Sequence, residues 1–297
     1  MKRGILFLTI ILLAAFWNFK TEAQVAPPPR LVAQGDLEKL VQGKEETIEA
    51  GGGVFFKISP QEMFRQNMII FDKKIKVVGL EGGRFIAYAR IESGPTIYWI
   101  IGEYTGGAHC CGVYHFLSRP EGGQPVRYLG KTTGHNGGPL PLGGLCIYHQ
   151  GQLYFKDLDN RFDYFHASHA DSRLVNFPPR FYHLTSASLK VSNLPFKEVY
   201  LRKVSQVEEE ISKNLTLRRV KPPALLKSGF APGFMMMEFT DPLGQLLIKR
   251  TILYLYARQD QEAWQTLERD VPKYYQTTDW LKELGKDILE HLSAAPY

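Results

Sequence analysis

The sequence predicts an α+β protein in which an N-terminal antiparallel β meander is followed by a C-terminal α-helical domain. Two observations support this fold class. From Thr47 to Leu184, short apolar runs rich in β-branched and aromatic residues alternate with glycine-containing turns. After Phe196, apolar residues recur every three or four positions, which is the spacing of amphipathic helices. A sandwich, a barrel or a propeller-like sheet would each suit the β part.

Residues 1–23 have the pattern of a signal peptide. Met1–Arg3 is positively charged, Ile5–Trp17 is an apolar run, and Thr21–Ala23 places small residues where signal peptidase cleaves. We therefore expect cleavage before Gln24 and a periplasmic or secreted protein. The apolar run is shorter than the roughly 20 residues that span a bilayer, so no membrane span is expected after cleavage.

The predicted domains are residues 24–195, a β-rich domain, and residues 196–297, a helical domain. The length of 297 residues fits two domains, and 44% hydrophobic with 22% charged residues is typical of a globular protein. The formal net charge is +6, but the basic residues are scattered. Their densest patch, Leu217–Lys221, is followed by prolines rather than interleaved with aromatic residues, so no nucleic-acid partner is expected.

In the first 195 residues, one short helix is expected at Leu31–Val41. Strands are expected at the apolar runs Val54–Ile58, Ile75–Val78, Arg84–Ile91, Thr96–Tyr104, Val113–Leu117, Val126–Leu129, Cys146–Tyr148, Leu153–Phe155 and Phe177–Leu184. Hairpin turns are expected at Glu81–Gly83, Glu121–Gly123 and His149–Gln152. Gly134–Gly144 has too many glycines and prolines for a regular element, which predicts a surface loop near the cysteines.

Four stretches in the C-terminal third predict helices. Phe196–Leu217 has apolar residues at helical intervals, and Pro222-Pro223 ends it. Gln245–Ala257 and Glu262–Asp270 are expected as two helices, with Asp260 as the N-cap of the second. A last helix has one apolar face, formed by Trp280, Leu281, Leu284, Ile288 and Leu292.

The most unusual stretch is Glu103–Ser118, EYTGGAHCCGVYHFLS, in which two adjacent cysteines follow a Gly-Gly pair and a histidine. Outside the cytoplasm, Cys110, Cys111 and Cys146 should form one disulfide and leave one thiol. A bond from Cys146 to either of the others would join two strands and stabilise the fold by about 2–4 kcal/mol. A vicinal Cys110–Cys111 bond would close a strained ring that is easily reduced. Because strain makes vicinal bonds less common, the sequence favours the cross-strand pairing.

Histidines near these cysteines raise two other hypotheses. Zinc or copper could be held by His109, Cys110, Cys111 and His135, with His115, Cys146 and His149 nearby in sequence. Adjacent cysteines lack the two-residue separation that lets two thiolates coordinate one tetrahedral ion, so the spacing argues against a metal and we expect no cofactor. A catalytic cysteine needs a histidine and a third group that orients it. His135 is a candidate histidine, but no pattern selects it, and the catalytic residues stay unknown.

The acidic segment Asp157–Asp163, DLDNRFD, has acids at the first, third and seventh positions of something like a calcium loop. Arg161 stands where a further oxygen ligand is needed, and no glycine makes the sharp bend. We therefore expect an ion-free turn rather than a calcium site.

The corner Tyr104–Cys111, followed by a β run and the acidic segment, resembles a loose group of uncharacterised bacterial secreted proteins with a GGAHCC motif. Their acidic turn is akin to the DxDxDG loop of integrin-type β repeats, and Arg161 departs from it. Members tend to end in a short helical segment. The resemblance covers roughly Ile97–Leu184 and implies location and architecture, without an activity.

These observations predict a periplasmic or secreted, non-enzymatic protein that serves as a binding or structural module of the cell envelope. Its expected partner is another envelope or extracellular protein. The alternative is a thiol-redox or metal-dependent activity at His109-Cys110-Cys111. The state of the three cysteines discriminates between the two hypotheses.

Overall fold

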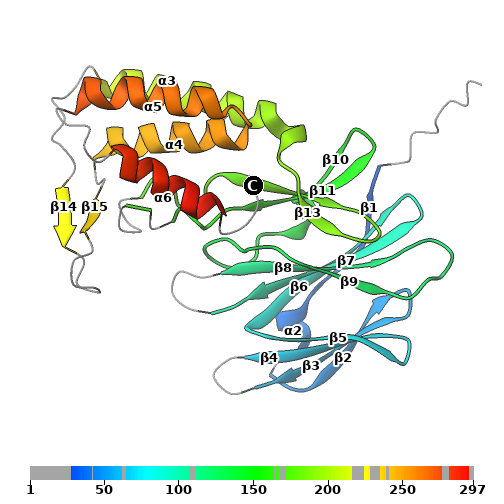
Figure 1. Cartoon of the computed structure of the whole chain (residues 1–297). Helices are drawn as coiled ribbons and strands as arrows, with labels where there is room; N and C mark the ends of the chain where they lie inside the picture. The colour runs from blue at the N-terminus through cyan, green and yellow to red at the C-terminus, as the bar shows by residue number, and fades with distance from the viewer. Residues whose placement is uncertain are drawn as a thin grey trace, which may run out of the picture.

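The computed structural model describes residues 28–41, 43–61, 65–106, 111–163, 165–166, 172–215, 224–227, 235–238, 241–275 and 281–293. Within these residues, antiparallel sheets come first and helices follow (Figure 1). The predicted α+β class, with a β meander before a helical part, is therefore confirmed. The predicted signal peptide, residues 1–23, lies outside the described residues, and its cleavage stays a prediction.

Three antiparallel sheets form the β part. The first contains β2 (Glu46–Gly51), β3 (Val54–Pro60), β4 (Gln66–Asp72) and β5 (Ile75–Gly82) in sequence order. The second has the order β1-β6-β7-β8-β9 and contains β1 (Arg30–Asp36), β6 (Arg84–Ser93), β7 (Thr96–Tyr104), β8 (Gly112–Arg119) and β9 (Arg127–Lys131). The third contains β10 (Cys146–His149), β11 (Gln152–Leu158), β12 (Pro179–Leu184) and β13 (Leu189–Val191). Consecutive strands are neighbours nearly throughout, and β1 joins the edge of the second sheet.

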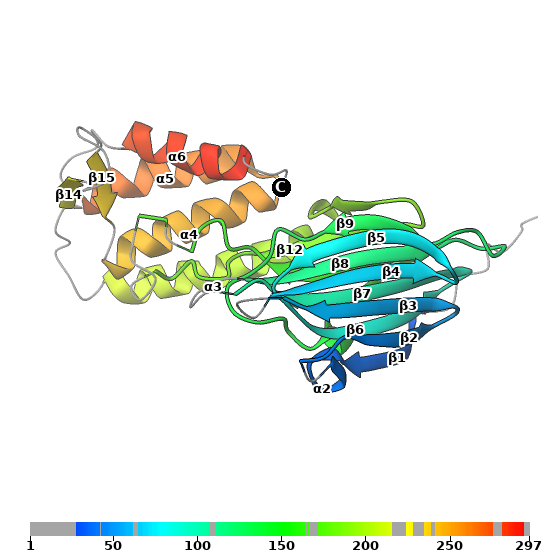
Figure 2. The same cartoon turned by 90° about the horizontal axis from the view of Figure 1, so that it is seen from below.

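The second sheet is the middle layer, because apolar clusters cover both of its faces. Trp99 of β7 belongs to a cluster that includes Phe56 of the first sheet. Ile100, the next residue, belongs to a different cluster that includes Phe155 of the third sheet. Successive strand residues point to opposite faces, so β7 must be apolar on both. Figure 2 shows the first sheet lying over the second, and the stack is closest to the sandwich among the predicted architectures.

The N-terminal segment differs from its prediction. The prediction of a helix over Leu31–Val41 is wrong, because Arg30–Asp36 is strand β1 and only α2 (Leu37–Val41) is helical. The β1 backbone pairs with β6, a partner 50 or more positions away that local spacing does not reveal. Asp36 marks the change, since its carboxylate accepts from the backbone N–H of Lys39 at 3.0 Å, as an N-cap does. Strands β2, β4 and β13 are also absent from the predicted set.

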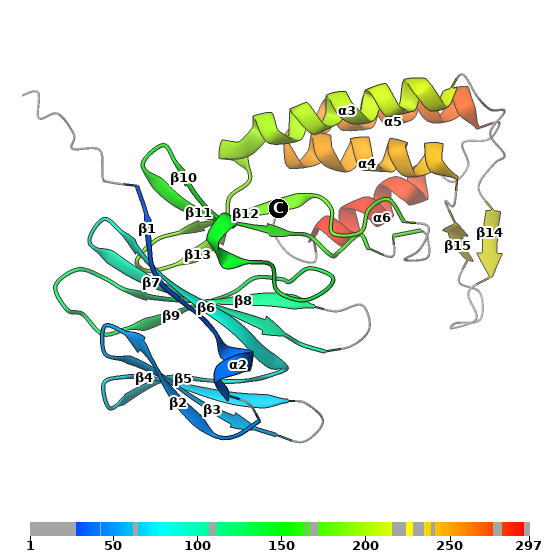
Figure 3. The same cartoon turned by 180° about the vertical axis from the view of Figure 1, so that it is seen from behind.

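The C-terminal helices lie where the periodicity places them. They are α3 (Lys197–Leu215), α4 (Pro242–Tyr256), α5 (Asp260–Tyr274) and α6 (Leu281–Ser293). One cap is corrected: Asp260 is the first residue of α5, and Gln259 is the N-cap. Two short strands that the sequence analysis did not predict, β14 (Ala224–Lys227) and β15 (Met235–Glu238), form a hairpin beyond the helices, away from the sheets (Figures 1 and 3).

The helices share an apolar core with the third sheet. This core contains Tyr154 of β11 and Phe181 of β12 together with Tyr200 of α3 and Ile288 of α6. The Phe181 ring stacks on the ring of Phe196, with centroids 3.8 Å apart. Phe196 belongs to the 3-10 turn Leu194–Phe196. The layers therefore run from first to third sheet and then to the helices. This core contains residues from both sides of position 195, where the predicted domain boundary lies. It also contains residues of the connection between β11 and β12, which therefore lies where the sheets meet the helices.

Candidate functional site

In the corner Tyr104–Cys111, between β7 and β8, the structure describes residues 104–106 and Cys111. Cys111 is held by Thr105. Its backbone N–H donates to Thr105 Oγ1 at 3.0 Å, and the Thr105 backbone N–H donates to the Cys111 carbonyl at 3.0 Å. The β7–β8 ladder continues from there, with Tyr104 opposite Gly112. Residues 107–110, which include the candidates His109 and Cys110, lie outside the described residues.

The Gly134–Gly144 segment passes beside the corner, as the sequence predicts. Gly112 and His135 exchange two backbone hydrogen bonds, of 2.8 and 3.0 Å. A methyl group on Gly112 would lie 2.7 Å from the His135 ring, so glycine is needed at this contact. His135 itself is only 1% exposed, so this end of the segment is buried rather than on the surface.

His135 forms a buried pair with Asp157 of β11. The ring donates from Nδ1 to Asp157 Oδ1 at 2.8 Å and from Nε2 to the Gly138 carbonyl at 3.0 Å. Both partners are acceptors, and only an imidazolium donates from both nitrogens. Burial alone would lower the pKa of His135, but the hydrogen bond and charge of Asp157 outweigh it and raise the pKa. Tyr114 stacks on the ring with centroids 5.7 Å apart.

The cysteines differ from the favoured pairing. Cys111 is disulfide-bonded, whereas Cys146 is a free cysteine. The cross-strand bond through Cys146 is therefore wrong. The physical reason is the layering, since Cys146 lies on β10 of the third sheet, whereas Cys111 precedes β8 of the second. Burial raises the pKa of the Cys146 thiol to about 12, which keeps it protonated and unreactive at neutral pH.

Few of the candidate metal ligands come together. Within the described ranges, no group of three His, Cys, Asp or Glu side chains is arranged to hold a metal ion. Cys111 and His135 are brought to the same corner, as Gly134 lies against Cys111. His115 instead pairs with Glu103, and the His149 ring packs on Phe196 with centroids 5.1 Å apart.

The acidic segment sends its three carboxylates to three different partners. Asp157 pairs with His135, Asp159 with Arg161, and Asp163 accepts from the backbone N–H of Asn176 at 2.7 Å. A calcium loop needs carboxylates that converge on one point. Asn160, between them, donates from Nδ2 toward Cys111 Sγ at 3.4 Å. The segment therefore connects the cysteine corner to other parts of the fold.

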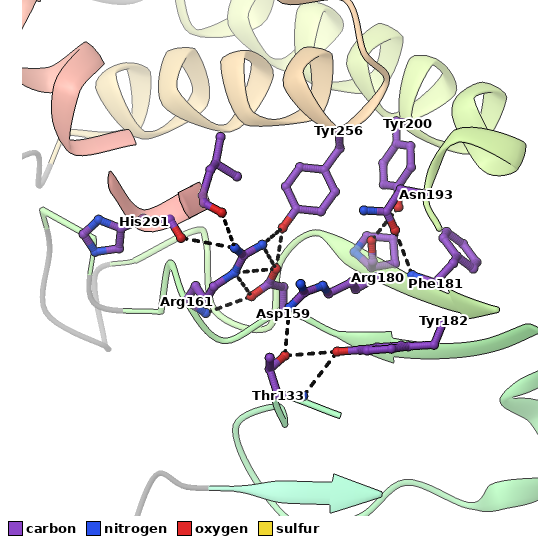
Figure 4. A network of polar contacts seen from close by, with 12 residues as sticks. Thr133, Asp159, Arg161, Arg180, Phe181, Tyr182, Asn193, Tyr200, Tyr256 and His291 are labelled. Atoms are coloured by element: carbon purple, nitrogen blue, oxygen red, sulfur yellow. Dashed lines mark hydrogen bonds and ion pairs between the residues drawn. The ribbon is translucent and has the colours of Figure 1, made fainter. Parts of the chain in front are cut away.

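Its contact with the helices runs through Asp159 and Arg161 (Figure 4). Asp159 is fully buried, and the Arg161 side chain is 9% exposed. Arg161 Nε donates to both carboxylate oxygens at 3.0 Å, and the Tyr256 hydroxyl of α4 also donates to Asp159. Burial would raise the pKa of Asp159, but the hydrogen bonds and charge of Arg161 outweigh it and lower the pKa.

Beside this pair, Arg180 of β12 joins the sheet to the loop that carries His135. It is 1% exposed and donates from Nη1 to Thr133 Oγ1 at 3.1 Å (Figure 4). Thr133 also contacts the Tyr182 hydroxyl, through its backbone N–H at 3.2 Å and its side chain at 3.1 Å. The polar network therefore extends from the loop after β9 to the third sheet, beside the Asp159–Arg161 pair (Figure 4).

A second buried pair, Glu103 and His115, was not singled out from the sequence as a site. His115 Nε2 donates to Glu103 Oε2 at 2.6 Å, and the Tyr128 hydroxyl contacts His115 Nδ1 at 2.9 Å. Glu103 Oε1 accepts from the Gly83 backbone N–H at 2.7 Å. Burial and the charge of Glu103 raise the pKa of Tyr128 to about 12, so the phenol stays protonated. The sequence did hold a signal for this pair. Glu103 and His115 are ionisable residues on the otherwise apolar strands β7 and β8, where they lie two positions apart in the pairing register.

Comparisons with family models, curated proteins and solved structures give no match to this chain. No helix among the described residues is both long and apolar enough to cross a membrane.

Proposed function

We propose that the mature protein works in the cell envelope as a non-enzymatic binding or structural module. The use of its buried histidines carries this proposal. His135 engages Asp157 and Gly138, and His115 engages Glu103 and Tyr128, so both ring nitrogens of each histidine are engaged inside the fold. A general acid or base must reach a substrate proton with a ring nitrogen. The two pairs serve to hold strands and loops together.

The buried charges of the acidic segment support the same proposal. Asp159 and Arg161 are nearly inaccessible and face Tyr256 and α6 rather than an open cleft. Buried ion pairs that are fully hydrogen-bonded fix one arrangement of the elements they join. Three stacked sheets that share a core with a helical part are suited to presenting a surface to an envelope or extracellular protein.

The test uses the full chain expressed with its leader in a bacterium. A photo-crosslinking residue is placed at Ile75 in β5 or at Leu289 in α6, two exposed apolar positions with 72% and 48% exposure. We expect the processed protein in the envelope fraction and one discrete crosslinked envelope protein from one position but not the other. Retention in the cytoplasm, the absence of a discrete adduct from both positions, or turnover of a dithiol substrate would contradict the proposal.

A thiol-redox role is the second candidate, and the state of the cysteines favours it. Cys111 is disulfide-bonded while Cys146 is free, and the chain has three cysteines. We therefore propose a vicinal bond between Cys110 and Cys111. A dithiol reductant would supply two electrons and two protons: its own thiols become a disulfide, and the Cys110–Cys111 bond opens to two thiols. The Asn160 amide, aimed at Cys111 Sγ, would favour the thiolate during exchange.

Non-reducing peptide mapping tests this pairing and should recover a Cys110–Cys111 peptide and a free Cys146. A mild dithiol should open the bond while the fold persists, and thiol labelling should then be fast. Labelling should slow in His109→Ala, because an imidazolium beside a thiolate lowers the thiol pKa. Cys146→Ala is the matched control and should leave labelling of the corner unchanged. A Cys146-linked peptide, or slow labelling that His109→Ala does not alter, excludes the redox role.

A further inference from the structure

Arg161 is surrounded by oxygen atoms from three parts of the chain. Its Nη2 donates to Asp159 Oδ2 at 2.7 Å, in addition to the two bonds from Nε. Its Nη1 donates to the main-chain carbonyls of His291 and Leu292 at 3.1 and 3.0 Å. Nη2 also donates to the Tyr256 hydroxyl, which in turn donates to Asp159 (Figure 4). One carboxylate, two carbonyls and one phenol therefore face one guanidinium.

This set of oxygens is of the kind that holds a cation. His291 and Leu292 belong to the last turn of α6, whose carbonyls lack partners inside the helix. The same turn carries the negative end of the helix dipole. Carboxylate and carbonyl oxygens also make up the ligand sets of hard cations. In the acidic segment, the position where a calcium loop would need an oxygen ligand instead supplies the positive charge.

We propose that this cluster is an oxygen-lined cation site that Arg161 fills, and that the tethered guanidinium docks the C-terminal end of α6 onto the β part. A guanidinium suits the site because its donors lie in a fixed planar fork. One edge serves the carboxylate and another serves two successive helix carbonyls. The Arg161 guanidinium thereby joins the turn that follows β11 to α6, whose His291 is 130 positions away in the sequence.

Other contacts join the same two segments. His166 Nε2 lies 3.1 Å from Asp287 Oδ2 of α6. The His291 ring stacks on Phe162 with centroids 5.8 Å apart and meets Phe165 edge-on at 4.8 Å. All of these residues on the β side lie within residues 159–166. Beyond the apolar face of α6, which packs in the shared core, these contacts come from a short stretch whose only arginine is Arg161.

The test is Arg161→Gly in the full chain, followed by amide hydrogen exchange with and without free guanidinium at low millimolar concentration. Amides of α6 should exchange about tenfold or more faster than in the wild type, while those of β7 and β8 keep their protection. Added guanidinium should restore the protection of α6 in a saturable way. Sodium chloride at equal ionic strength should not, because it screens charge without filling the site.

The matched control is Arg269→Gly. Arg269 also makes a two-pronged contact with a carboxylate, Asp270, but its side chain is 65% exposed. Guanidinium should have no protective effect on this variant. Unchanged exchange of α6 in Arg161→Gly, or equal recovery with sodium chloride, or equal recovery in Arg269→Gly, overturns the proposal.

Arg161→Lys covers the case in which the glycine variant does not fold. Lysine keeps the charge but lacks the fork, so it cannot serve the carboxylate and both carbonyls together. Exchange in α6 should then be intermediate, with the sheets unaffected. Protection of α6 equal to that of the wild type in Arg161→Lys would show that the guanidinium does not dock the helix.

Discussion

Replacing Asp159 with asparagine measures how strongly the junction depends on one buried charge. Asparagine keeps the shape of the side chain but leaves the Arg161 guanidinium, 9% exposed, without the carboxylate it now contacts. Removing one partner of a buried ion pair costs about 3–5 kcal/mol, because the remaining charge stays buried. The partly open edge of Arg161 places this site toward the lower value. We expect the free energy of unfolding at neutral pH to fall by about 3 kcal/mol.

Two further variants apportion this loss. Tyr256→Phe removes the hydrogen bond that the hydroxyl donates to Asp159 and the one that it accepts from Arg161, and should cost about 1.5–3 kcal/mol. Arg161→Met combined with Asp159→Asn should cost clearly less than the sum of the single changes, because each single change leaves a buried group unsatisfied. The expected coupling is about 1–3 kcal/mol.

Urea denaturation, monitored with two spectroscopic probes, gives these free energies. The comparison requires that the dependence of the free energy of unfolding on urea concentration is the same in all variants. The pKa of Asp159 is lowered in the fold, so its contribution is present above the unfolded value of about 3.9 and is lost as pH falls through the lowered pKa. The asparagine variant should lack this acid-side decline. A loss below about 1 kcal/mol, or strict additivity of the two changes, would refute the reasoning.

Three other predictions follow from the site and the leader. The pKa of His135 is raised, so the stabilisation that its charge provides is complete below about pH 6.5 and is lost as pH rises through the raised value. His135→Gln should remove this pH dependence. If the free energy of unfolding changes equally with pH in both proteins between about pH 5 and 9, the prediction is wrong. Gly112→Ala should cost about 1–3 kcal/mol, since the new methyl group would lie 2.7 Å from the His135 ring, and thermal unfolding at wild-type temperature would exclude this contact. Exported protein should begin at Gln24, and an intact mass that retains Met1–Ala23 rules out the proposed cleavage.

Features set by neighbouring residues could be predicted from the sequence. The hairpin turn at His149–Gln152 has Gln150 and Gly151 at φ values of 50° and 77°, the left-handed pair that a two-residue hairpin requires. The four helices were found for the same reason, because an amphipathic face repeats within one turn of the helix. Strand β1 was missed because its strand form depends on pairing with β6, which the spacing of its own residues does not reveal.

The candidate site was only partly determined by sequence. The corner, the Gly134–Gly144 segment and the acidic segment were identified by their residue types, and only the Gly134–Gly144 segment was expected to lie near the corner. Their pairings were not, since His135 and Asp157 are 22 positions apart and Tyr256 and Asp159 are 97 apart. A buried carboxylate takes whichever donor the packing of layers brings within hydrogen-bond distance, and the cost of leaving it unpaired fixes that choice. The layers also placed Cys146 in the third sheet and Cys111 next to the second, so the tertiary structure, rather than the spacing of the cysteines, left Cys146 as a free thiol.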